Sequence, residues 1–377
     1  MAGIYIHIPF CKQACHYCNF HFSTSLRYKA PLVDALTKEI ELATGLPPFS
    51  KGATLDTIYL GGGTPSILSV NELQKIWSAI EQNFLISSNA EITLEANPDD
   101  ITPQSLQNWR SLGINRLSVG IQSFQPEELK WMNRAHNHEE AFQCLQWISE
   151  AGFDNYSIDL IYGSPLLTDA QWQSNVEHVL KYRVPHISCY ALTIEPQTPL
   201  DKLVRKKERA ATDNNQQADQ FLLLMDWMHA AGYLHYEISN FSLPGKQSKH
   251  NSSYWQQQPY LGIGPSAHSY DGKSRRWNVA NNAKYIQAIG EGVIPFESET
   301  LTPIQRYNEY VMTALRTMEG ISLKQIEADF GFNQAAELKR QVIKWVETQK
   351  IIQQEDFLQL TREGKLYADG IAADLFI

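Results

Sequence analysis

Along the first 200 residues, short apolar segments alternate with longer segments in which apolar residues recur every three to four positions. The apolar segments predict buried strands at 4–9, 57–60, 91–96, 116–121, 156–161 and 186–192. The amphipathic segments predict helices at 30–43, 70–82, 102–112, 139–151 and 169–182. Strands and helices in alternation are typical of an α/β fold with a parallel sheet and helical crossovers. Six such units favour a partial (β/α)6 barrel of the TIM type over a doubly wound sheet, although the pattern alone does not separate the two.

The remainder of the chain has a different texture. The polar stretch 201–220 predicts a loop that leads into a helix at 221–231, and residues 233–300 are rich in glycine, proline and aromatic residues without a clean period. Helices are then predicted at 305–318, 323–330 and 334–348, a hairpin at 351–361 and a last helix at 363–373. That order is typical of a winged-helix-like α+β module. We therefore divide the chain into a core at 1–240, an extension at 241–300 and a C-terminal module at 301–377.

Composition and charge restrict the classes of function. With 43% hydrophobic residues, the chain can bury a full core, and its net charge of −9 argues against a broad nucleic-acid surface. The C-terminal module carries 9 basic and 11 acidic residues, so we expect it to pack or contact proteins and not to bind DNA. No apolar run is long enough to span a bilayer and no targeting segment is recognised, which predicts a cytoplasmic protein and leaves peripheral membrane contact open.

Three of the five cysteines lie within eight positions, directly after the first predicted strand. They are Cys11, Cys15 and Cys18, with the spacing C-x3-C-x2-C. Three thiolates suit a [4Fe–4S] cluster in which one iron stays open, whereas structural zinc sites usually take four protein ligands. A zinc site completed by His16 or His21 is the alternative. A disulfide is not expected in a reducing compartment.

Further polar residues interrupt the apolar segments where the predicted strands end. Gly61-Gly-Gly-Thr-Pro65 follows the second strand, and glycines there let a ligand approach the backbone and its amide donors. No Lys-Ser/Thr pair follows, so this is not a P-loop. Glu95, Gln122 and Asp159 each end a later strand. A charged residue inside a barrel is costly unless it is paired or binds a ligand, so we expect these positions to share one pocket.

In this order, over about residues 1–240, the motifs resemble those of the radical S-adenosylmethionine (SAM) family. The resemblance implies a [4Fe–4S] cluster on Cys11, Cys15 and Cys18, with SAM on the open iron. Tyr5-Ile-His-Ile-Pro-Phe10, the glycine motif and Arg134-Ala-His136 are similar to the branch that contains anaerobic coproporphyrinogen III dehydrogenase and the HemW-type haem chaperones. The resemblance implies SAM contacts for Tyr5, Gly62, Gly63, Thr64, Glu95, Gln122, Arg134 and Asp159, and a place beside the cluster for Tyr17. Arg134 would then pair with a carboxylate.

Two features favour the chaperones within this branch. The dehydrogenase carries a further cysteine two positions after the third, where this chain has Phe20, and it has an N-terminal extension where only ten residues precede Cys11 here. His250-Asn-Ser-Ser-Tyr254-Trp255 resembles the H-N-x-x-Y-W motif of the chaperones. If this segment is helical, His250 and Tyr254 share one face. A lone histidine near aromatic residues is usually structural, but the resemblance implies haem contact at His250, and imidazole is a common axial ligand of haem iron.

These observations predict a haem chaperone that binds haem and a SAM-liganded cluster and delivers haem to acceptor proteins. Dimerisation and cleavage of SAM are left open. The alternative is an oxygen-independent coproporphyrinogen III dehydrogenase, a radical SAM enzyme that decarboxylates its substrate oxidatively. An RNA-modifying radical SAM enzyme would need a basic surface that this acidic chain does not indicate.

Overall fold

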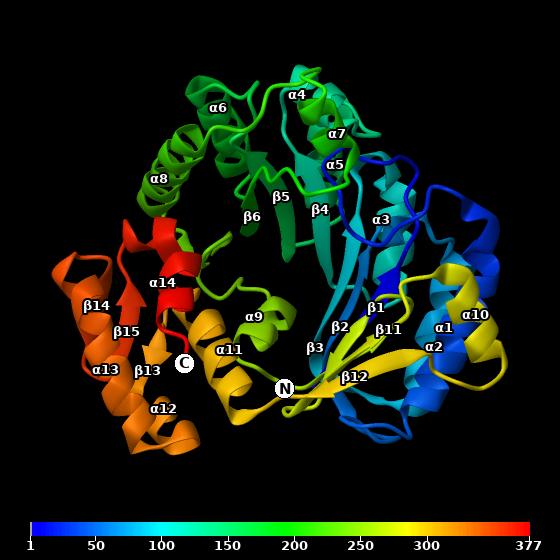
Figure 1. The fold of residues 1–377 in the computed structure, drawn as a ribbon. Helices are drawn as coiled ribbons and strands as arrows, with labels where there is room; N and C mark the ends of the chain where they lie inside the picture. The colour runs from blue at the N-terminus through cyan, green and yellow to red at the C-terminus, as the bar shows by residue number, and fades with distance from the viewer. Residues whose placement is uncertain (1) are drawn as a thin grey trace.

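Six parallel strands form the curved centre of the molecule, and helices cover their outer face (Figure 1). The computed structural model describes residues 2–377. The strands are β1 (Gly3–Ile8), β2 (Thr54–Gly62), β3 (Leu85–Ala96), β4 (Arg116–Gln122), β5 (Tyr156–Tyr162) and β6 (His186–Ala191). The main crossover helices are α1 (Lys29–Ala43), α2 (Val70–Asn83), α3 (Pro103–Ser111), α5 (His138–Glu150) and α6 (Asp169–Lys181). The α/β fold with a partial (β/α)6 barrel is therefore confirmed.

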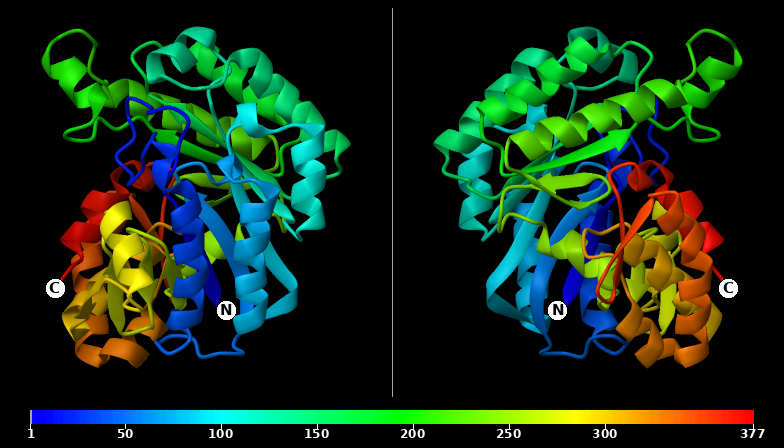
Figure 2. Two further views of the ribbon diagram at one scale, coloured as in Figure 1. Left: turned by 90° about the vertical axis from the view of Figure 1, so that its right-hand side faces the viewer. Right: turned by 90° about the vertical axis from the view of Figure 1, so that its left-hand side faces the viewer.

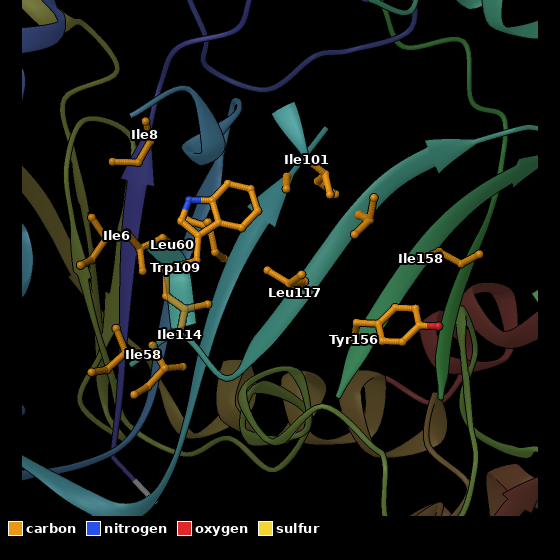
Figure 3. Close-up of a cluster of buried hydrophobic side chains, with 14 of the residues drawn as sticks. Ile6, Ile8, Ile58, Leu60, Ile101, Trp109, Ile114, Leu117, Tyr156 and Ile158 are labelled. Carbon is orange, nitrogen blue, oxygen red and sulfur yellow. The ribbon is translucent and has the colours of Figure 1, made fainter. Parts of the chain in front are cut away.

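Side chains along these strands alternate between an apolar and a polar face, as the pleat of a strand requires. The outward face packs under the helices, and part of it is labelled in Figure 3: Ile6, Ile8, Ile58, Leu60, Leu117 and Ile158. The inward face carries residues of the opposite parity, mostly polar: Tyr5, His7, Thr93, Glu95, Arg116, Ser118, Ser157, Asp159, His186 and Ser188. Burial of the apolar face stabilises the sheet against its helices. The polar residues are thereby left in the barrel interior.

Residues 241–300 extend this sheet at one edge instead of forming a separate layer. β9 (Tyr260–Ile263) pairs in parallel with β1, and three antiparallel strands follow: β10 (His268–Tyr270), β11 (Ser274–Asn278) and β12 (Phe296–Thr300). At the other edge, β8 (Asn240–Ser242) and β7 (Leu234–Glu237) continue the sheet beyond β6. The segment also contains α9 (Lys249–Trp255) and α10 (Asn282–Gly290). The absence of a clean period in the sequence reflects these short elements.

The prediction of a loop over 201–220 was wrong in two places. α7 (Pro199–Arg205) begins at a proline after Thr198, whose side chain accepts from the Asp201 amide, and α8 (Asn214–Ala230) begins after Asp213. One polar residue of α8 lies in the core, where its hydrogen bonds are satisfied. Gln220 is fully buried, donates to Leu167 O over 2.9 Å and accepts from the Gly163 amide over 2.8 Å. A glutamine whose hydrogen bonds are made within the protein can therefore lie on the buried face of a helix, and the polar sequence does not reveal that face.

The C-terminal module has the predicted winged-helix-like order. It consists of α11 (Pro303–Leu315), β13 (Ile321–Ser322), α12 (Leu323–Phe330), α13 (Phe332–Glu347), β14 (Ile351–Gln354), β15 (Phe357–Leu360) and α14 (Ala368–Asp374). A separate hydrophobic cluster around Val311, Leu338 and Ile371 forms its core. Backbone hydrogen bonds between Ile238 and Arg316 and between Met318 and Tyr236 join it to the core of the molecule (Figures 1 and 2).

Candidate cluster and cofactor site

The cysteine loop leaves the C-terminal end of β1 and turns back on itself. The Ser23 amide donates to Pro9 O over 2.9 Å, and the Cys11 amide donates to Ser23 O over 3.1 Å. Cys11, Cys15 and Cys18 are free and half-buried, and all three line one cavity of about 440 Å³. Within residues 2–377, no three His, Cys, Asp or Glu side chains are placed so that they could hold one metal ion in common. In a [4Fe–4S] cluster, by contrast, each of the three thiolates ligates a different iron.

A short helix that the sequence pattern did not predict fixes the middle of this loop. α4 (Pro126–Met132) ends at Asn133, which has the left-handed φ of 58°. The Asn133 side chain donates to Ala14 O over 2.8 Å and accepts from the Gln13 side chain over 3.0 Å. The His16 amide donates to Met132 O over 3.0 Å. The end of α4 therefore holds the loop between Cys11 and Cys18 in place.

Arg134 connects three parts of the site. Its Nη1 lies 3.3 Å from Cys15 Sγ and 3.4 Å from the Tyr17 hydroxyl, and its Nη2 donates to Asn97 Oδ1 and Gly120 O over 2.8 and 2.7 Å. In the described part of the chain, its Nε is buried and has no partner. A guanidinium presents several donors in a fixed plane, which suits a carboxylate. Arg134 also lines the main cavity, where its positive charge suits an anionic group of a ligand.

The glycine motif allows close packing beside the cysteine loop, and two of its amides are already used within the protein. The Gly62 amide donates to Glu95 Oε2 over 2.9 Å and the Gly63 amide to Ile8 O over 2.9 Å, so neither is free for a ligand. A Cβ at Gly63 would stand 2.7 Å from Phe10 O, and one at Gly62, where φ is 110°, would stand 2.5 Å from the His7 ring. Only glycine lets the end of β2 lie this close to the cysteine loop.

Three strand-end side chains reach the same cavity from β3, β4 and β5. Glu95 accepts from the Tyr59 hydroxyl over 2.8 Å, and burial raises the pKa of its carboxyl to about 7. Burial also raises the pKa of Asp159 to about 6, although Ser188 and Arg116 oppose part of the shift. Gln122 has a φ of 69°, an uncommon value for a residue other than glycine, at the point where β4 ends. The cavity thus holds two carboxyl groups that ionise near neutral pH.

Most of the residues predicted for this site meet here. The cavity is lined by the three cysteines and by Tyr17, Gly62, Gly63, Thr64, Glu95, Gln122, Arg134 and Asp159. Tyr5 does not line it and lies deeper in the barrel, where its hydroxyl is 3.1 Å from His7 Nδ1 and its ring stacks on Tyr59. Asn97 does line the cavity and was missed. It lies two residues beyond Glu95, and the period of a strand already places both on one face.

His250 lies apart from this cavity. The predicted helix is confirmed as α9, but the imidazole is buried and both ring nitrogens are engaged, Nδ1 with Thr57 Oγ1 and Nε2 with the Tyr254 hydroxyl, each at 2.8 Å. Its ring stacks on Tyr59 with centroids 4.9 Å apart. Burial lowers the pKa of His250 to about 3, so the ring is neutral. In this arrangement the imidazole holds α9 against β2.

Tyr254, the hydrogen-bond partner of His250, and the next residue, Trp255, line a second cavity of about 240 Å³. Tyr260 and Tyr270 of β9 and β10 complete an aromatic wall, in which the rings of Tyr254 and Tyr260 meet edge to face at 4.6 Å. Arg275 and Glu309 form an ion pair of 2.8 Å at the rim next to α11. The cavity therefore offers ring faces and one arginine in a cleft between the sheet and the C-terminal module.

Comparisons with known proteins agree with this geometry. The radical SAM superfamily model matches residues 5–179, and the HemN C-terminal domain model matches residues 301–367. Fold and site together thus define a radical SAM protein. The solved structure of coproporphyrinogen III oxidase (HemN) from Escherichia coli superposes with a TM-score of 0.86 over 100% of this chain and 90% of that one, at 23% identity, which shows a common fold.

Full-length relatives identify the family more closely. The heme chaperone HemW of Bacillus subtilis is 33% identical over 98% of this chain and 98% of its own length. The heme chaperone HemW of Mycobacterium tuberculosis strain H37Rv is 32% identical over 99% of this chain and 94% of its own, and that of Escherichia coli K12 is 29% identical over 100% and 98%. The chain belongs to the HemW family.

Proposed function

We propose that the protein is a haem chaperone, which binds haem together with a SAM-liganded [4Fe–4S] cluster and transfers the haem to acceptor proteins. The observation that carries the proposal is the similarity, over nearly the whole of both chains, to relatives named heme chaperones. The likeness to HemN extends to the fold alone. Phe20, in the position of the dehydrogenase's additional cysteine, is 69% exposed and lines the main cavity.

The main cavity suits the cluster and SAM. Cys11, Cys15 and Cys18 would hold three irons, and the guanidinium of Arg134 would pair with a carboxylate. Glu95 and Asp159 would accept hydrogen bonds from amino or ribose hydroxyl groups, and Gln122 and Thr64 would complete the wall. When bound, the cluster and SAM together supply one-electron chemistry at the sulfonium of SAM. The residues of this chain hold it in a half-closed barrel interior, where water is largely excluded.

Haem contact is proposed at the cleft beside α9. Tyr254, Trp255 and Tyr260 line it with aromatic rings, and Arg275, which is ion-paired with Glu309, would offer a positive charge to a propionate of the macrocycle. The cavity is smaller than a whole macrocycle, so it would receive one edge of it. His250 would act behind this surface by fixing the Tyr254 hydroxyl, because ligation of iron by its Nε2 would break a 2.8 Å hydrogen bond.

SAM binding should depend on pH, because only the ionised forms of Glu95 and Asp159 accept hydrogen bonds with a full charge. Their pKa values of about 7 and about 6 lie above the ordinary range, so the empty site takes up protons as pH falls. We expect the SAM dissociation constant to rise about tenfold per pH unit between pH 7 and 6 and, because both carboxyl groups then take up a proton, about a hundredfold per pH unit below pH 6. Isothermal titration between pH 5.5 and 8 measures this slope. Glu95→Gln should remove the slope between pH 7 and 6 that comes from Glu95, and Glu337→Gln on α13, far outside the cavity lining, should leave it unchanged. An affinity independent of pH would contradict the assignment.

The alternative activity is tested with its substrate. The reconstituted protein is incubated with coproporphyrinogen III, SAM and a reductant, and the products are separated by chromatography. We expect no decarboxylated product at any time. Steady accumulation of protoporphyrinogen over repeated turnovers would show instead that the protein is the dehydrogenase.

We also propose a cytoplasmic location, in keeping with free thiols at the cluster site. No helix within residues 2–377 is long and apolar enough to cross a membrane. Acceptor proteins are the proposed macromolecular partners. A homodimer and contact with a membrane surface stay open, and nucleic acid is not a proposed partner.

A further inference from the structure

The twelve-stranded sheet ends at β12, whose outer edge is not covered by any element within residues 2–377. β12 pairs with β11 on one side and is the last strand in the sheet order, and all five of its residues, Phe296–Thr300, are exposed (Figure 1). Proteins usually cover or shorten such an edge, because its unpaired amides and carbonyls can bind another strand. A long edge strand that is exposed on both faces is therefore a candidate site for an extended segment of a second protein.

The register of β12 shows which of its main-chain groups face this outer edge. The Leu301 amide donates to Lys273 O over 2.9 Å, which fixes the alternation of hydrogen-bonded pairs between β11 and β12. In an antiparallel pair only every second residue bonds to the residue opposite it, so Glu299, which has the parity of Leu301, bonds to β11. Ser298 and Thr300 have the other parity and direct their amides and carbonyls away from β11. These main-chain groups have no partner within residues 2–377.

Two glutamates make this edge acidic. Glu297 and Glu299 are two positions apart and therefore lie on the same face of β12. Neither carboxylate is in a salt bridge within the described residues, and Arg275, the residue opposite Glu299, pairs with Glu309 over 2.8 Å. On an antiparallel strand added beyond β12, the residues opposite the two glutamates would form non-hydrogen-bonded pairs, in which side chains lie closest. Lysine or arginine at those positions would form opposite-charge pairs, which stabilise a sheet.

The same glutamates disfavour a second copy of this chain as the occupant of the edge. Two antiparallel β12 strands would have to bond through their outward residues, which are Phe296, Ser298 and Thr300. Each register that pairs Ser298 with one of these residues places Glu297 or Glu299 directly opposite another glutamate. Like charges in that position destabilise a sheet. The charges therefore favour a basic segment of a different protein.

The outer edge of β12 lies close to the cleft proposed for haem. Arg275 of β11 lines that cleft and stands directly opposite Glu299 of β12. Neighbouring strands are about 4.8 Å apart, so an added strand would run about 10 Å from the backbone of β11. A protein that docks through one segment at this edge would bring the rest of its surface within reach of the cleft.

We propose that the outer edge of β12 binds an extended segment of the haem acceptor, with basic residues at alternate positions, as an additional antiparallel strand of the sheet. Ser298 and Thr300 provide the main-chain hydrogen bonds, and Glu297 and Glu299 select the basic side chains. The identification of the partner as the haem acceptor rests on the proposed function, whereas the addition of a strand does not.

Two variants of β12 and one control variant test this proposal. Ser298→Pro removes one outward amide, and proline is tolerated in an edge strand where that amide takes no part in the ladder. Glu297→Lys/Glu299→Lys reverses the charge of the edge. Glu81→Lys/Glu347→Lys makes the same change in net charge at exposed positions near the C-terminal ends of α2 and α13.

The probe is a fluorescent peptide in which lysine and threonine alternate, and a peptide of alternating glutamate and threonine is its counterpart. Binding of each peptide to the reconstituted, haem-loaded protein is followed by fluorescence anisotropy, and hydrogen exchange over residues 296–300 is measured with and without peptide. In a second measurement, apomyoglobin and apomyoglobin extended by the lysine peptide are compared as acceptors of haem.

We expect the lysine peptide to slow hydrogen exchange over residues 296–300 and both β12 variants to weaken its binding at least about tenfold. Ser298→Pro acts by loss of a main-chain hydrogen bond and obstruction of the edge, and the charge reversal acts by repulsion, which added salt should reduce. Glu81→Lys/Glu347→Lys should bind the peptide as the unaltered chain does. The extended apomyoglobin should take up haem faster than apomyoglobin itself, and Ser298→Pro should abolish that difference.

Equal affinity for the glutamate peptide, or unchanged exchange over residues 296–300, would overturn the proposal. So would undiminished binding by β12 variants that keep a native circular-dichroism spectrum, or equal rates of transfer to the two forms of apomyoglobin. A dimer of the unaltered chain that Ser298→Pro dissociates in sedimentation experiments would show that a second copy occupies the edge. Failure of haem transfer to apomyoglobin itself would count against the proposed function, whereas the peptide measurements do not depend on that transfer.

Discussion

Replacement of Cys15 by alanine should abolish the cluster and, with it, tight binding of SAM. Cys15 lies in the centre of the loop, 3.3 Å from Arg134 Nη1, and its sulfur is one of only three thiols that line the main cavity. Two remaining thiolates cannot hold a [4Fe–4S] cluster with a single open iron. After anaerobic reconstitution, we expect iron and sulfide to fall to background, the visible cluster absorption to disappear and SAM affinity to drop by at least about a hundredfold, since the open iron is lost.

Cys144→Ala is the matched control, because it also removes one of the five thiols. Cys144 is buried in α5 and donates only to Ala141 O within its own helix. This variant should reconstitute like the unaltered chain. A full cluster in Cys15→Ala would contradict the assignment, as would a loss of iron in Cys144→Ala with a native circular-dichroism spectrum.

Trp255→Ala should weaken haem binding by at least about fivefold, since a stacked aromatic contact contributes about 1 kcal/mol beyond its buried area. His250→Gln tests a different contribution. Because both imidazole nitrogens are already hydrogen-bonded, we expect the absorption spectrum of bound haem to keep its band positions in this variant, with a smaller loss of affinity. Tyr254→Phe, which removes the hydroxyl that His250 holds, should reproduce that loss. Haemin titrations followed by absorption measure both the haem affinity and the band positions of the bound haem.

Trp345→Ala, a half-buried tryptophan on α13, controls for the loss of an indole elsewhere. Its haem affinity should equal that of the unaltered protein. A shift of the Soret band in His250→Gln but not in Tyr254→Phe would show instead that the imidazole ligates the iron, in which case α9 must open when haem binds. Unchanged affinity in Trp255→Ala would place haem outside this cleft.

The strongly periodic parts of the chain predicted the fold well. Apolar positions such as Ile6, Leu60 and Leu117 face the helices, so the strands on which they lie could be identified from their pattern. The alternate positions of the same strands, including Glu95 and Asp159, point into the barrel. A pocket shared by these side chains could therefore be predicted. The cysteine spacing predicted the position of the loop for a simpler reason, because all three residues lie in one local segment.

The sequence could not show where tertiary contacts provide the partners of a residue. Gln220 reads as exposed but is buried by its hydrogen bonds, and the amides of Gly62 and Gly63 are used within the protein. His250 resembles a ligand in sequence, yet Thr57, 193 positions away, occupies its Nδ1. None of these partners is near in sequence, so no local pattern could predict them. The inward layer of a sheet is assembled from distant segments, and its chemistry depends on that assembly.

The central claim, that this radical SAM fold carries haem, is tested most directly by transfer. The reconstituted protein is loaded with haemin, desalted to remove free haem and mixed with an excess of a haem-free acceptor such as apomyoglobin, while the spectrum of each separated protein is recorded. We expect a Soret band that survives desalting and then moves to the acceptor, with loss of the band from the donor in equal measure. A protein that leaves the desalting column without haem, or that keeps its haem in the presence of every acceptor tried, would contradict the account.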